Sequence, residues 1–245
     1  MPTADYDAIA AWYDALVRSD SFVGDLVLSH LFTMLGDVHG RHICDLACGQ
    51  GRLARTLAQK GAQVVGVDIS TQLIAIAQRD EATHPLGITY IVDNAVTLTS
   101  LGDAQFHGVV CNLALMDIPD LTAVCHAVWR ILRPAGWFVF SITHPCFESP
   151  HATWRMAPDG MISREIFTYF TEGVWRSSNL QGVRGQVGAN HRMLSTYLNT
   201  LSQTGLVIDQ IREPQPAHAD TVAIPGYHVV PAFMLVRCTK PSADQ

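Results

Sequence analysis

Four short apolar runs in the first half of the chain each end in side chains that accept hydrogen bonds. The residues at these ends are Asp45, Asp68, Asp93 with Asn94, and Asn112. Ionised carboxylates accept hydrogen bonds and attract cations, while amides both donate and accept. A pocket built from these groups favours a ligand that carries hydroxyl groups and positive charge.

The loop that follows Asp45 has the sequence DLACGQG and admits two kinds of cofactor. Gly49 and Gly51 followed by Ala54 nearly match the loop that holds a dinucleotide pyrophosphate at a helix N-terminus. Asp45 would repel that pyrophosphate, and the short motif by itself is weak. S-adenosylmethionine has no phosphate and carries a sulfonium and an ammonium group, so the same carboxylate would attract it. The sequence therefore favours S-adenosylmethionine, with NAD(P) as the alternative.

The remaining strand-end residues suit the nucleoside part of such a cofactor. We expect Asp68 to accept hydrogen bonds from both ribose hydroxyls, although a dinucleotide enzyme uses the same position. Asp93, Asn94 and Ala95 are placed to bind the adenine amino group and ring nitrogen. Asn112 is expected near the reacting methyl group.

The apolar runs that carry these residues alternate with amphipathic helical patterns. The runs cover residues 42–47, 63–70, 87–95, 106–114 and 136–144, and the helical patterns cover 51–62, 71–82 and 121–132. Short apolar runs without polar alternation are typical of strands buried on both faces, which predicts a parallel, doubly wound α/β sheet. Ligands of such sheets bind at the carboxyl ends of the strands. The pattern resumes with a helix at 192–205 and strands at 206–212 and 232–238.

Local signals mark the helix ends. Gly61 is predicted to end the helix that follows the glycine loop. Ser70 is predicted to cap helix 71–82, and Asp117 to mark the start of helix 121–132.

Two segments lie outside this alternation. Residues 5–36 have helical spacing with a break at Ser19-Asp20-Ser21, which predicts two helices. Residues 145–190 are rich in Pro, Gly and aromatic side chains and form an insert, in which 165–170 (EIFTYF) is a candidate strand. We expect this insert to cap the acceptor.

Composition narrows the class of protein. A chain of 245 residues with 48% hydrophobic composition suits a single domain, 1–245. A net charge of −6 and the lack of a Lys/Arg run argue against nucleic acid as the main partner. The N-terminus lacks the features of a signal peptide, and no window has the roughly 18–20 apolar residues that span a bilayer. Six cysteines without a C-x-x-C pair indicate reduced thiols in the cytoplasm.

The ordered set DLACGQG, VVGVDIS, VDNA, CNLALMDIPD and ILRPAGWFVFSITHP resembles the motif series of the class I S-adenosylmethionine-dependent methyltransferases. The likeness is greatest to the small-molecule branch that includes the ubiquinone-biosynthesis type, and it is strongest over residues 40–145. It implies a Rossmann-like, doubly wound, seven-stranded sheet of order 3-2-1-4-5-7-6 with the last strand antiparallel. It also implies a small insert after strand 5 and a helical lid formed by residues 1–38.

The resemblance and the strand-end positions together predict the residues that bind S-adenosylmethionine. They are Tyr13 of the lid, Asp45, Ala47, Gly49, Gly51, Asp68, Ile69, Asp93, Asn94, Ala95, Asn112 and Leu113. The predicted reaction is methyl transfer to oxygen, nitrogen or carbon of a small acceptor by a monomer or homodimer. An oxidoreductase is disfavoured by Asp45 and by the lack of a Tyr-x-x-x-Lys pair, and a catalytically silent nucleoside-binding module is the third alternative.

The acceptor is expected to be aromatic or apolar because the insert is rich in aromatic residues. The predicted acceptor-binding residues are Phe147, Trp154, Tyr169, Trp175 and Arg192, the last as an anchor for an acidic group. His144 ends the fifth strand and is held extended by Pro145, which makes it the candidate general base, with His191 as the alternative. No metal is predicted, because His144, His151 and His191 match no known ligand spacing.

Overall fold

The apolar runs of the sequence form one mixed sheet in the computed structural model, which describes residues 4–19, 22–216 and 226–242. Over these residues the sheet has seven strands: β1 (His42–Leu46), β2 (Gln63–Asp68), β3 (Thr89–Val92), β4 (Phe106–Asn112), β5 (Leu132–Thr143), β10 (Val207–Arg212) and β11 (Phe233–Thr239). Their order is β3-β2-β1-β4-β5-β11-β10, and β11 is antiparallel to both of its neighbours. The predicted seven-stranded order with an antiparallel last strand is confirmed.

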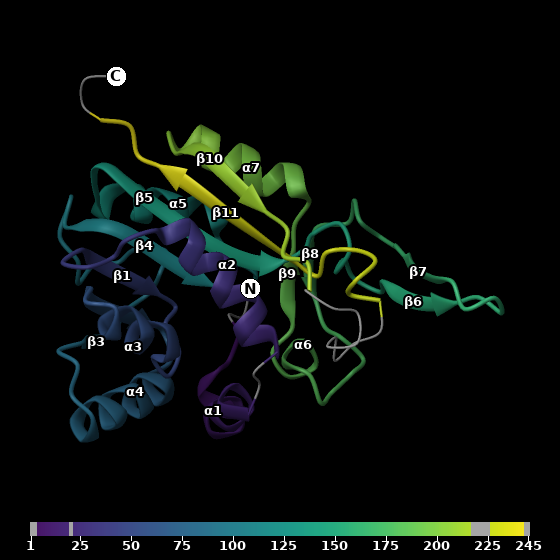
Figure 1. Cartoon of the computed structure of the whole chain (residues 1–245), viewed down its shortest axis with the longest axis horizontal. Helices are drawn as coiled ribbons and strands as arrows, with labels where there is room; N and C mark the ends of the chain where they lie inside the picture. Colours follow the sequence, from purple (N-terminus) through teal and green to yellow (C-terminus); the bar gives the residue numbers. More distant parts are fainter. Residues whose placement is uncertain (1–3, 20–21, 217–225, 243–245) are drawn as a thin grey trace.

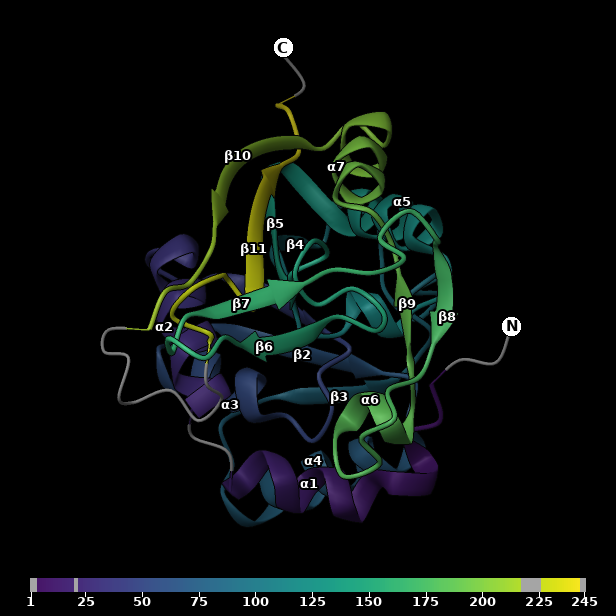
Figure 2. The same cartoon turned by 90° about the vertical axis from the view of Figure 1, so that its right-hand side faces the viewer.

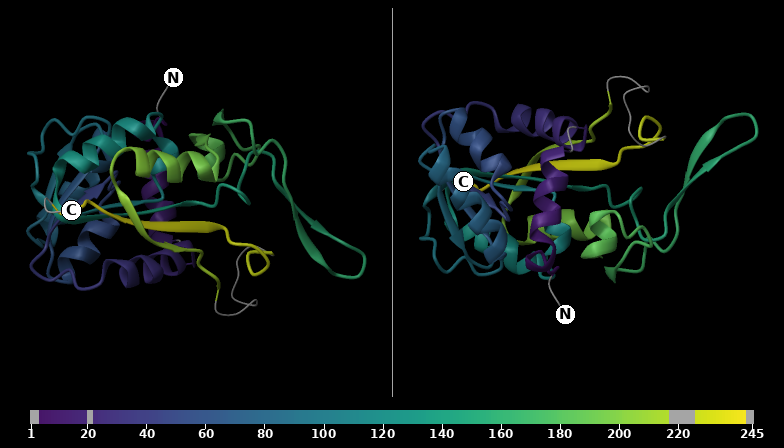
Figure 3. Two further views of the ribbon diagram at one scale, coloured as in Figure 1. Left: turned by 90° about the horizontal axis from the view of Figure 1, so that it is seen from above. Right: turned by 90° about the horizontal axis from the view of Figure 1, so that it is seen from below.

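Helices cover both faces of this sheet (Figure 3). The described helices are η1 (Asp7–Ile9), α1 (Ala10–Ser19), α2 (Phe22–Leu35), α3 (Arg52–Gln59), α4 (Thr71–Thr83), η2 (Leu115–Asp117), α5 (Leu121–Ile131), α6 (Val183–Gln186) and α7 (Leu194–Gln203). Helices α2, α3 and α4 bury Leu31, Leu57 and Ile74 against one face of the sheet. Helices α5 and α7 bury Val128 and Leu201 against the other. The two apolar layers fix the sheet, and with it the strand ends.

Two of the three predicted helix-end signals are confirmed. Helix α3 ends just before Gly61, whose φ of 87° only glycine adopts readily. The Ser70 hydroxyl caps α4 by accepting a hydrogen bond from Leu73 N at 3.1 Å. The prediction for Asp117 is wrong: Asp120 caps α5 by accepting from Ala123 N at 2.9 Å. Pro119 holds the preceding residue in extended backbone, so a helix cannot begin at Asp117 and continue through it.

The insert differs most from its prediction. It holds two small sheets, one of β6 (Thr153–Met156) and β7 (Ile162–Glu165), the other of β8 (Gly173–Trp175) and β9 (Ala189–His191). The predicted strand at 165–170 is wrong, because β7 ends at Glu165 and Thr168 has a φ of 51°, which interrupts extended backbone. The β6–β7 hairpin projects from the body of the protein (Figures 1 and 3).

One element of the remaining insert, α6, lies near the first N-terminal helix. In both Figure 1 and Figure 2, α6 lies next to α1 at the end of the molecule toward which the parallel strands run. Two helices are present where the sequence predicted two, with α1 ending at Ser19 and α2 beginning at Phe22. Asp20 and Ser21 of the predicted break lie outside the described residues, as do residues 1–3 of the predicted lid.

Candidate functional site

Two adjoining cavities lie at the carboxyl ends of β1, β2 and β4. The lid cavity, of about 200 Å³, is enclosed by α1, α2, the glycine loop and α6. The strand-end cavity, of about 250 Å³, is enclosed by the ends of β2, β3 and β4 with the segment after β4. The residues that line both are Tyr6, Tyr13, Ala47, Gly49, Asn112 and Leu113. A ligand at this shared wall would extend into both cavities.

The structure brings most of the predicted cofactor residues to these walls. In addition to the shared residues, Asp68, Ile69, Asp93, Asn94 and Ala95 line the strand-end cavity, and Asp45 lines the lid cavity. They meet because β1–β4 are parallel, so their carboxyl ends share one edge of the sheet.

Asp45 lies at the floor of the lid cavity with one carboxylate oxygen unpaired. The residue is 1% exposed, and Oδ2 is one of three buried polar side-chain atoms without a hydrogen-bond partner among the described residues. Burial raises the pKa of Asp45 to about 8, opposed by a hydrogen bond from the Ala54 backbone N–H. A buried carboxylate with one unpaired oxygen is costly, and a neighbouring cation would relieve that cost. This orphaned oxygen fits the cationic amino-acid end of S-adenosylmethionine.

Asp68 ties the glycine loop to the end of β2. Its Oδ2 accepts from Gly49 N and its Oδ1 from Ser70 N, both at 2.8 Å. Burial raises the pKa of Asp68, while these N–H groups oppose the rise. Each oxygen keeps a second lone pair, so the carboxylate holds the loop and still has acceptor capacity at the cavity wall.

Gly51 shapes the loop without lining either cavity. It has a φ of 86°, and a Cβ at this position would lie 2.3 Å from Tyr90 Oη. Any side chain here would displace Tyr90 or the loop. The glycine thus sets the path of the backbone that Gly49 presents to the cavities.

The other two strand ends are fixed by local hydrogen bonds. Asp93 accepts from Ser100 N at 2.8 Å and from Asn94 N at 2.7 Å; burial raises its pKa, but these and further hydrogen bonds outweigh burial and lower it. Asn112 Oδ1 accepts from Ser141 Oγ at 2.7 Å, and Ser141 Oγ accepts from Leu113 N at 2.9 Å. The carboxamide of Asn112 is thereby held at the wall common to both cavities.

A cluster of three polar residues, none of which the sequence predicted to belong to the site, joins the two cavities. Asp117 lines the strand-end cavity, Arg184 the lid cavity and Tyr6 both. Asp117 accepts from Tyr6 Oη at 3.0 Å through one oxygen and from Arg184 Nη1 through the other. Burial raises the pKa of Asp117, and the Arg184 guanidinium opposes that rise. The signal in the sequence was that MDIPD holds two acids, of which only Asp120 is needed to cap α5, so that Asp117 is available for the cluster.

The histidines predicted to be catalytic lie outside both cavity walls. His144 Nδ1 accepts from Cys146 N at 3.2 Å, so Nε2 carries the proton and donates to Glu213 Oε1 at 2.8 Å. Burial lowers the pKa of His144. His191 Nε2 donates to the Tyr169 carbonyl at 2.7 Å.

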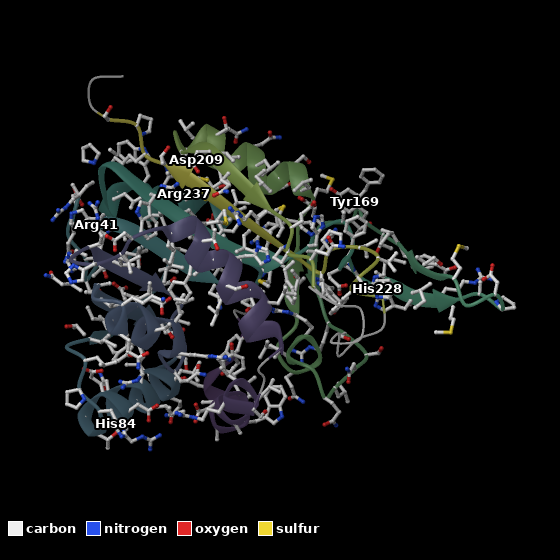
Figure 4. The ribbon with its side chains drawn as sticks, viewed as in Figure 1. Arg41, His84, Tyr169, Asp209, His228 and Arg237 are labelled. Carbon is white, nitrogen blue, oxygen red and sulfur yellow. The ribbon has the colours of Figure 1, made fainter. Side chains whose placement is uncertain are left out.

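The predicted acceptor-binding residues also lie elsewhere. Arg192 donates to the carbonyls of Leu115, Ile118 and Pro119, which holds the segment after β4 in place. Phe147, Trp154, Tyr169 and Trp175 line neither cavity. Tyr169, for example, lies near the base of the projecting hairpin, well separated from α1 (Figure 4). From the insert, Val183 and Arg184 reach the lid cavity, whose apolar walls otherwise come from Leu16, Val17, Val27, Leu28 and Leu53.

Other sequence expectations concern metals, thiols and membranes. Over the described part of the chain, no group of three His, Cys, Asp or Glu side chains is arranged to hold a metal ion. All six cysteines are described and are free thiols. No helix within residues 4–19, 22–216 and 226–242 is long and apolar enough to cross a membrane.

Comparison with known proteins identifies relatives of this chain. The sequence profile of a family described as "Methyltransferase domain" matches residues 44–140. The crystal structure of an S-adenosylmethionine dependent methyltransferase from Mesorhizobium loti is 31% identical, covers 87% of this chain and 97% of its own, and has a TM-score of 0.77. A putative S-adenosylmethionine dependent methyltransferase from Listeria monocytogenes is 27% identical, covers 89% of this chain and 100% of its own, and has a TM-score of 0.75.

A curated relative is the Ubiquinone biosynthesis O-methyltransferase of Alkalilimnicola ehrlichii, 30% identical over 141 residues. This match covers 56% of this chain and 57% of the relative, so the chain spans little more than half the length of that protein.

Proposed function

Because this chain belongs to the class I S-adenosylmethionine-dependent methyltransferases and uses S-adenosylmethionine as its cofactor, we propose that it methylates a small, largely apolar acceptor held in the lid cavity. The cofactor supplies a methyl group already activated by its sulfonium. The chain must therefore hold donor and acceptor in line, and alignment of this kind provides about 7–11 kcal/mol of barrier reduction.

The observation that supports this assignment of the cavities is the orphaned carboxylate oxygen of Asp45. It would accept from the cofactor ammonium at the floor of the lid cavity, while Asp68 would hold the ribose in the strand-end cavity. Asp93, Asn94 and Ala95 would surround the adenine, with Ile69 beside it. The methyl group would then lie near Asn112 and Leu113, at the wall that both cavities share.

The acceptor would occupy the part of the lid cavity that the cofactor leaves open. Leu16 and Val17 of α1 and Val27 and Leu28 of α2 make this part apolar, so the N-terminal helices take the role that the sequence assigned to the aromatic insert. The relatedness to ubiquinone-biosynthesis O-methyltransferases favours a hydroxyl as the accepting group.

Proton removal from the acceptor by His144 or His191 remains a prediction. The positions of both histidines outside the cavities weigh against it, as does the use of both His144 ring nitrogens in hydrogen bonds. We propose that alignment in the lid cavity, rather than a histidine base, is the main source of catalysis.

The experiment that tests the proposed function has two parts. Calorimetry should show binding of S-adenosylhomocysteine and no binding of NAD or NADP. Incubation with methyl-labelled S-adenosylmethionine and a panel of phenols, carboxylic acids and amines should then transfer label to at least one compound. Binding of NAD(P) in place of S-adenosylhomocysteine would contradict the assignment, and tight cofactor binding without any transfer would favour a silent nucleoside-binding module.

A further inference from the structure

Arg184 borders the lid cavity, and two of its three guanidinium nitrogens have no partner among the described residues. Nη1 donates to Asp117 Oδ1 and, at 3.1 Å, to the Gly188 carbonyl. Neither Nε nor Nη2 has a hydrogen-bond partner among the described residues, and neither is one of the buried unpaired atoms found there. With a side chain 20% exposed, Arg184 therefore has N–H groups that remain accessible.

The contacts of Arg184 hold it in one orientation. Asp117 is 9% exposed and is itself held from the other side by Tyr6 Oη. Because Asp117 and Gly188 both bind Nη1, the free edge of the guanidinium is the one formed by Nε and Nη2. That edge is a planar pair of donors that matches the two oxygens of a carboxylate.

The other residues of the lid cavity limit which ligands the Nε–Nη2 edge of Arg184 would bind. Its walls from α1 and α2 are apolar, and Asp45 is the carboxylate on its floor. If the cofactor ammonium binds Asp45, that negative charge is compensated. The other arginine at the cavity, Arg52, donates to the Val17 carbonyl at 3.0 Å. Among the described residues of the proposed acceptor region, Arg184 is then the hydrogen-bond donor that has a free planar edge.

Arg192, for which the sequence predicted this anchoring role, is differently placed. Its guanidinium is buried, donates to three backbone carbonyls and packs over Tyr197. The two arginines lie in the same segment of the chain, but their hydrogen bonds give them different roles.

We propose that Arg184 determines the class of acceptor: an apolar molecule that carries a carboxylate, bound through Nε and Nη2 of Arg184 with its apolar body against α1 and α2. This inference rests on the proposed function, which places the acceptor in the lid cavity.

The test measures binding of two non-reactive probes of equal shape, 2-naphthoate and 2-naphthamide, to the complex with S-adenosylhomocysteine. Calorimetry should show the wild-type protein binding the acid about ten- to a hundredfold more tightly than the amide, since hydrogen bonds to charged groups contribute about 1.5–3 kcal/mol. Arg184→Met should abolish this preference while changing the amide affinity little. Arg184→Lys should retain part of it, because lysine keeps the charge but loses the planar edge.

Arg176→Met is the matched control. Arg176 belongs to the same insert and also donates to backbone carbonyls, those of Gly185 and Gln186, but it lines neither cavity. Its loss should leave the ratio of acid to amide affinity unchanged.

Several results would overturn the inference. They are equal affinity of the wild-type protein for the two probes, binding of neither probe, or an equal fall in both affinities in Arg184→Met, which would mean a structural role. If Arg184→Met does not fold, Arg184→Lys carries the test, and an unchanged ratio of acid to amide affinity in that variant would overturn the inference. Failure to bind S-adenosylhomocysteine would instead count against the proposed function, so the two failures are distinguishable.

Discussion

The Asp45→Asn substitution should stabilise the free protein and weaken its cofactor binding. In the wild-type chain, burial raises the pKa of Asp45 from 3.8 to about 8, and Oδ2 has no hydrogen-bond partner among the described residues. Asparagine has nearly the same shape and no charge to lose. The carboxylate should thus be unfavourable for folding of the free chain and favourable for binding a cation.

The direction and size of this pKa shift give the expected difference in folding stability between the wild-type protein and Asp45→Asn. Below pH 3.8 Asp45 is protonated in both the folded and the unfolded chain, so its ionisation contributes nothing to the free energy of unfolding. As the pH rises toward 8, the unfolded chain ionises Asp45 while the folded chain keeps the proton. Wild-type stability then falls by about 1.4 kcal/mol per pH unit relative to Asp45→Asn, a difference on the order of 4 kcal/mol by pH 7.

In cofactor binding, the order of the two proteins should be reversed: the wild-type protein should bind more tightly than Asp45→Asn. A pKa of about 8 leaves roughly 0.9 proton on Asp45 at pH 7. If the ammonium of S-adenosylhomocysteine ionises Asp45, the wild-type protein releases that proton on binding and Asp45→Asn does not. Calorimetry in buffers of different ionisation enthalpy measures the release, and the affinity of the variant should be about ten- to a hundredfold lower.

Asp209→Asn is the control for this prediction. Asp209 lies 3.8 Å from Arg237 on the β10–β11 edge of the sheet, away from both cavities (Figure 4). This substitution should change neither proton release nor affinity. Equal proton release by the wild-type protein and Asp45→Asn would refute the reasoning, and lower stability of Asp45→Asn at every pH would mean that the carboxylate is paired in the free protein.

Three further predictions concern Asp68, His144 and Asp120. Asp68→Ala should lower the affinity for S-adenosylhomocysteine about ten- to a hundredfold in calorimetry, because both the ribose and Gly49 N lose their acceptor; unchanged affinity would remove Asp68 from the site. His144→Ala should lower the melting temperature and leave turnover per folded molecule nearly unchanged, since His144 is bonded to Glu213; a fall of roughly 10²–10⁴-fold with normal cofactor binding would establish it as the general base. Asp120→Ala should destabilise the protein by about 1 kcal/mol in denaturant titration by removing the cap of α5. Asp103→Ala is its control and should cost less, because it removes an exposed ion pair with Arg130 of the same helix but no cap.

The strand-end residues were predictable because their positions depend on local sequence and one global rule. Residues such as Ile43 and Val109 are buried on strands covered by helices, which the unbroken apolar runs indicate. Parallel strands then bring Asp45, Asp68 and Asn112 to one edge without further information. This part of the fold and of the candidate site follows from the periodicity of the sequence.

The acceptor side was not predictable in this way. Aromatic composition indicates that Trp154 or Trp175 will pack against something, but not against what, and Trp154 packs against Tyr227 more than 70 positions away. The roles of Arg184 and Arg192 depend on where the Asp117 carboxylate and the backbone carbonyls of the segment after β4 lie relative to the insert. That placement is a tertiary property of two segments that are distant in the sequence.

The end of β4 is the point at which the two cavities become one site. Ser141, from the neighbouring strand β5, binds both Asn112 and Leu113, and Leu113 adopts a φ of 54°, so the chain turns sharply there under the control of the sheet. A few residues later Asp117 connects to η1 through Tyr6 and to α6 through Arg184. In the proposed site the sheet edge positions the cofactor, while the two contacts of Asp117, with Tyr6 and Arg184, set the distance of the N-terminal segment and the insert from that edge. Selection for a different acceptor can therefore act on Arg184 and the lid helices without altering the strand ends to which we assign the cofactor.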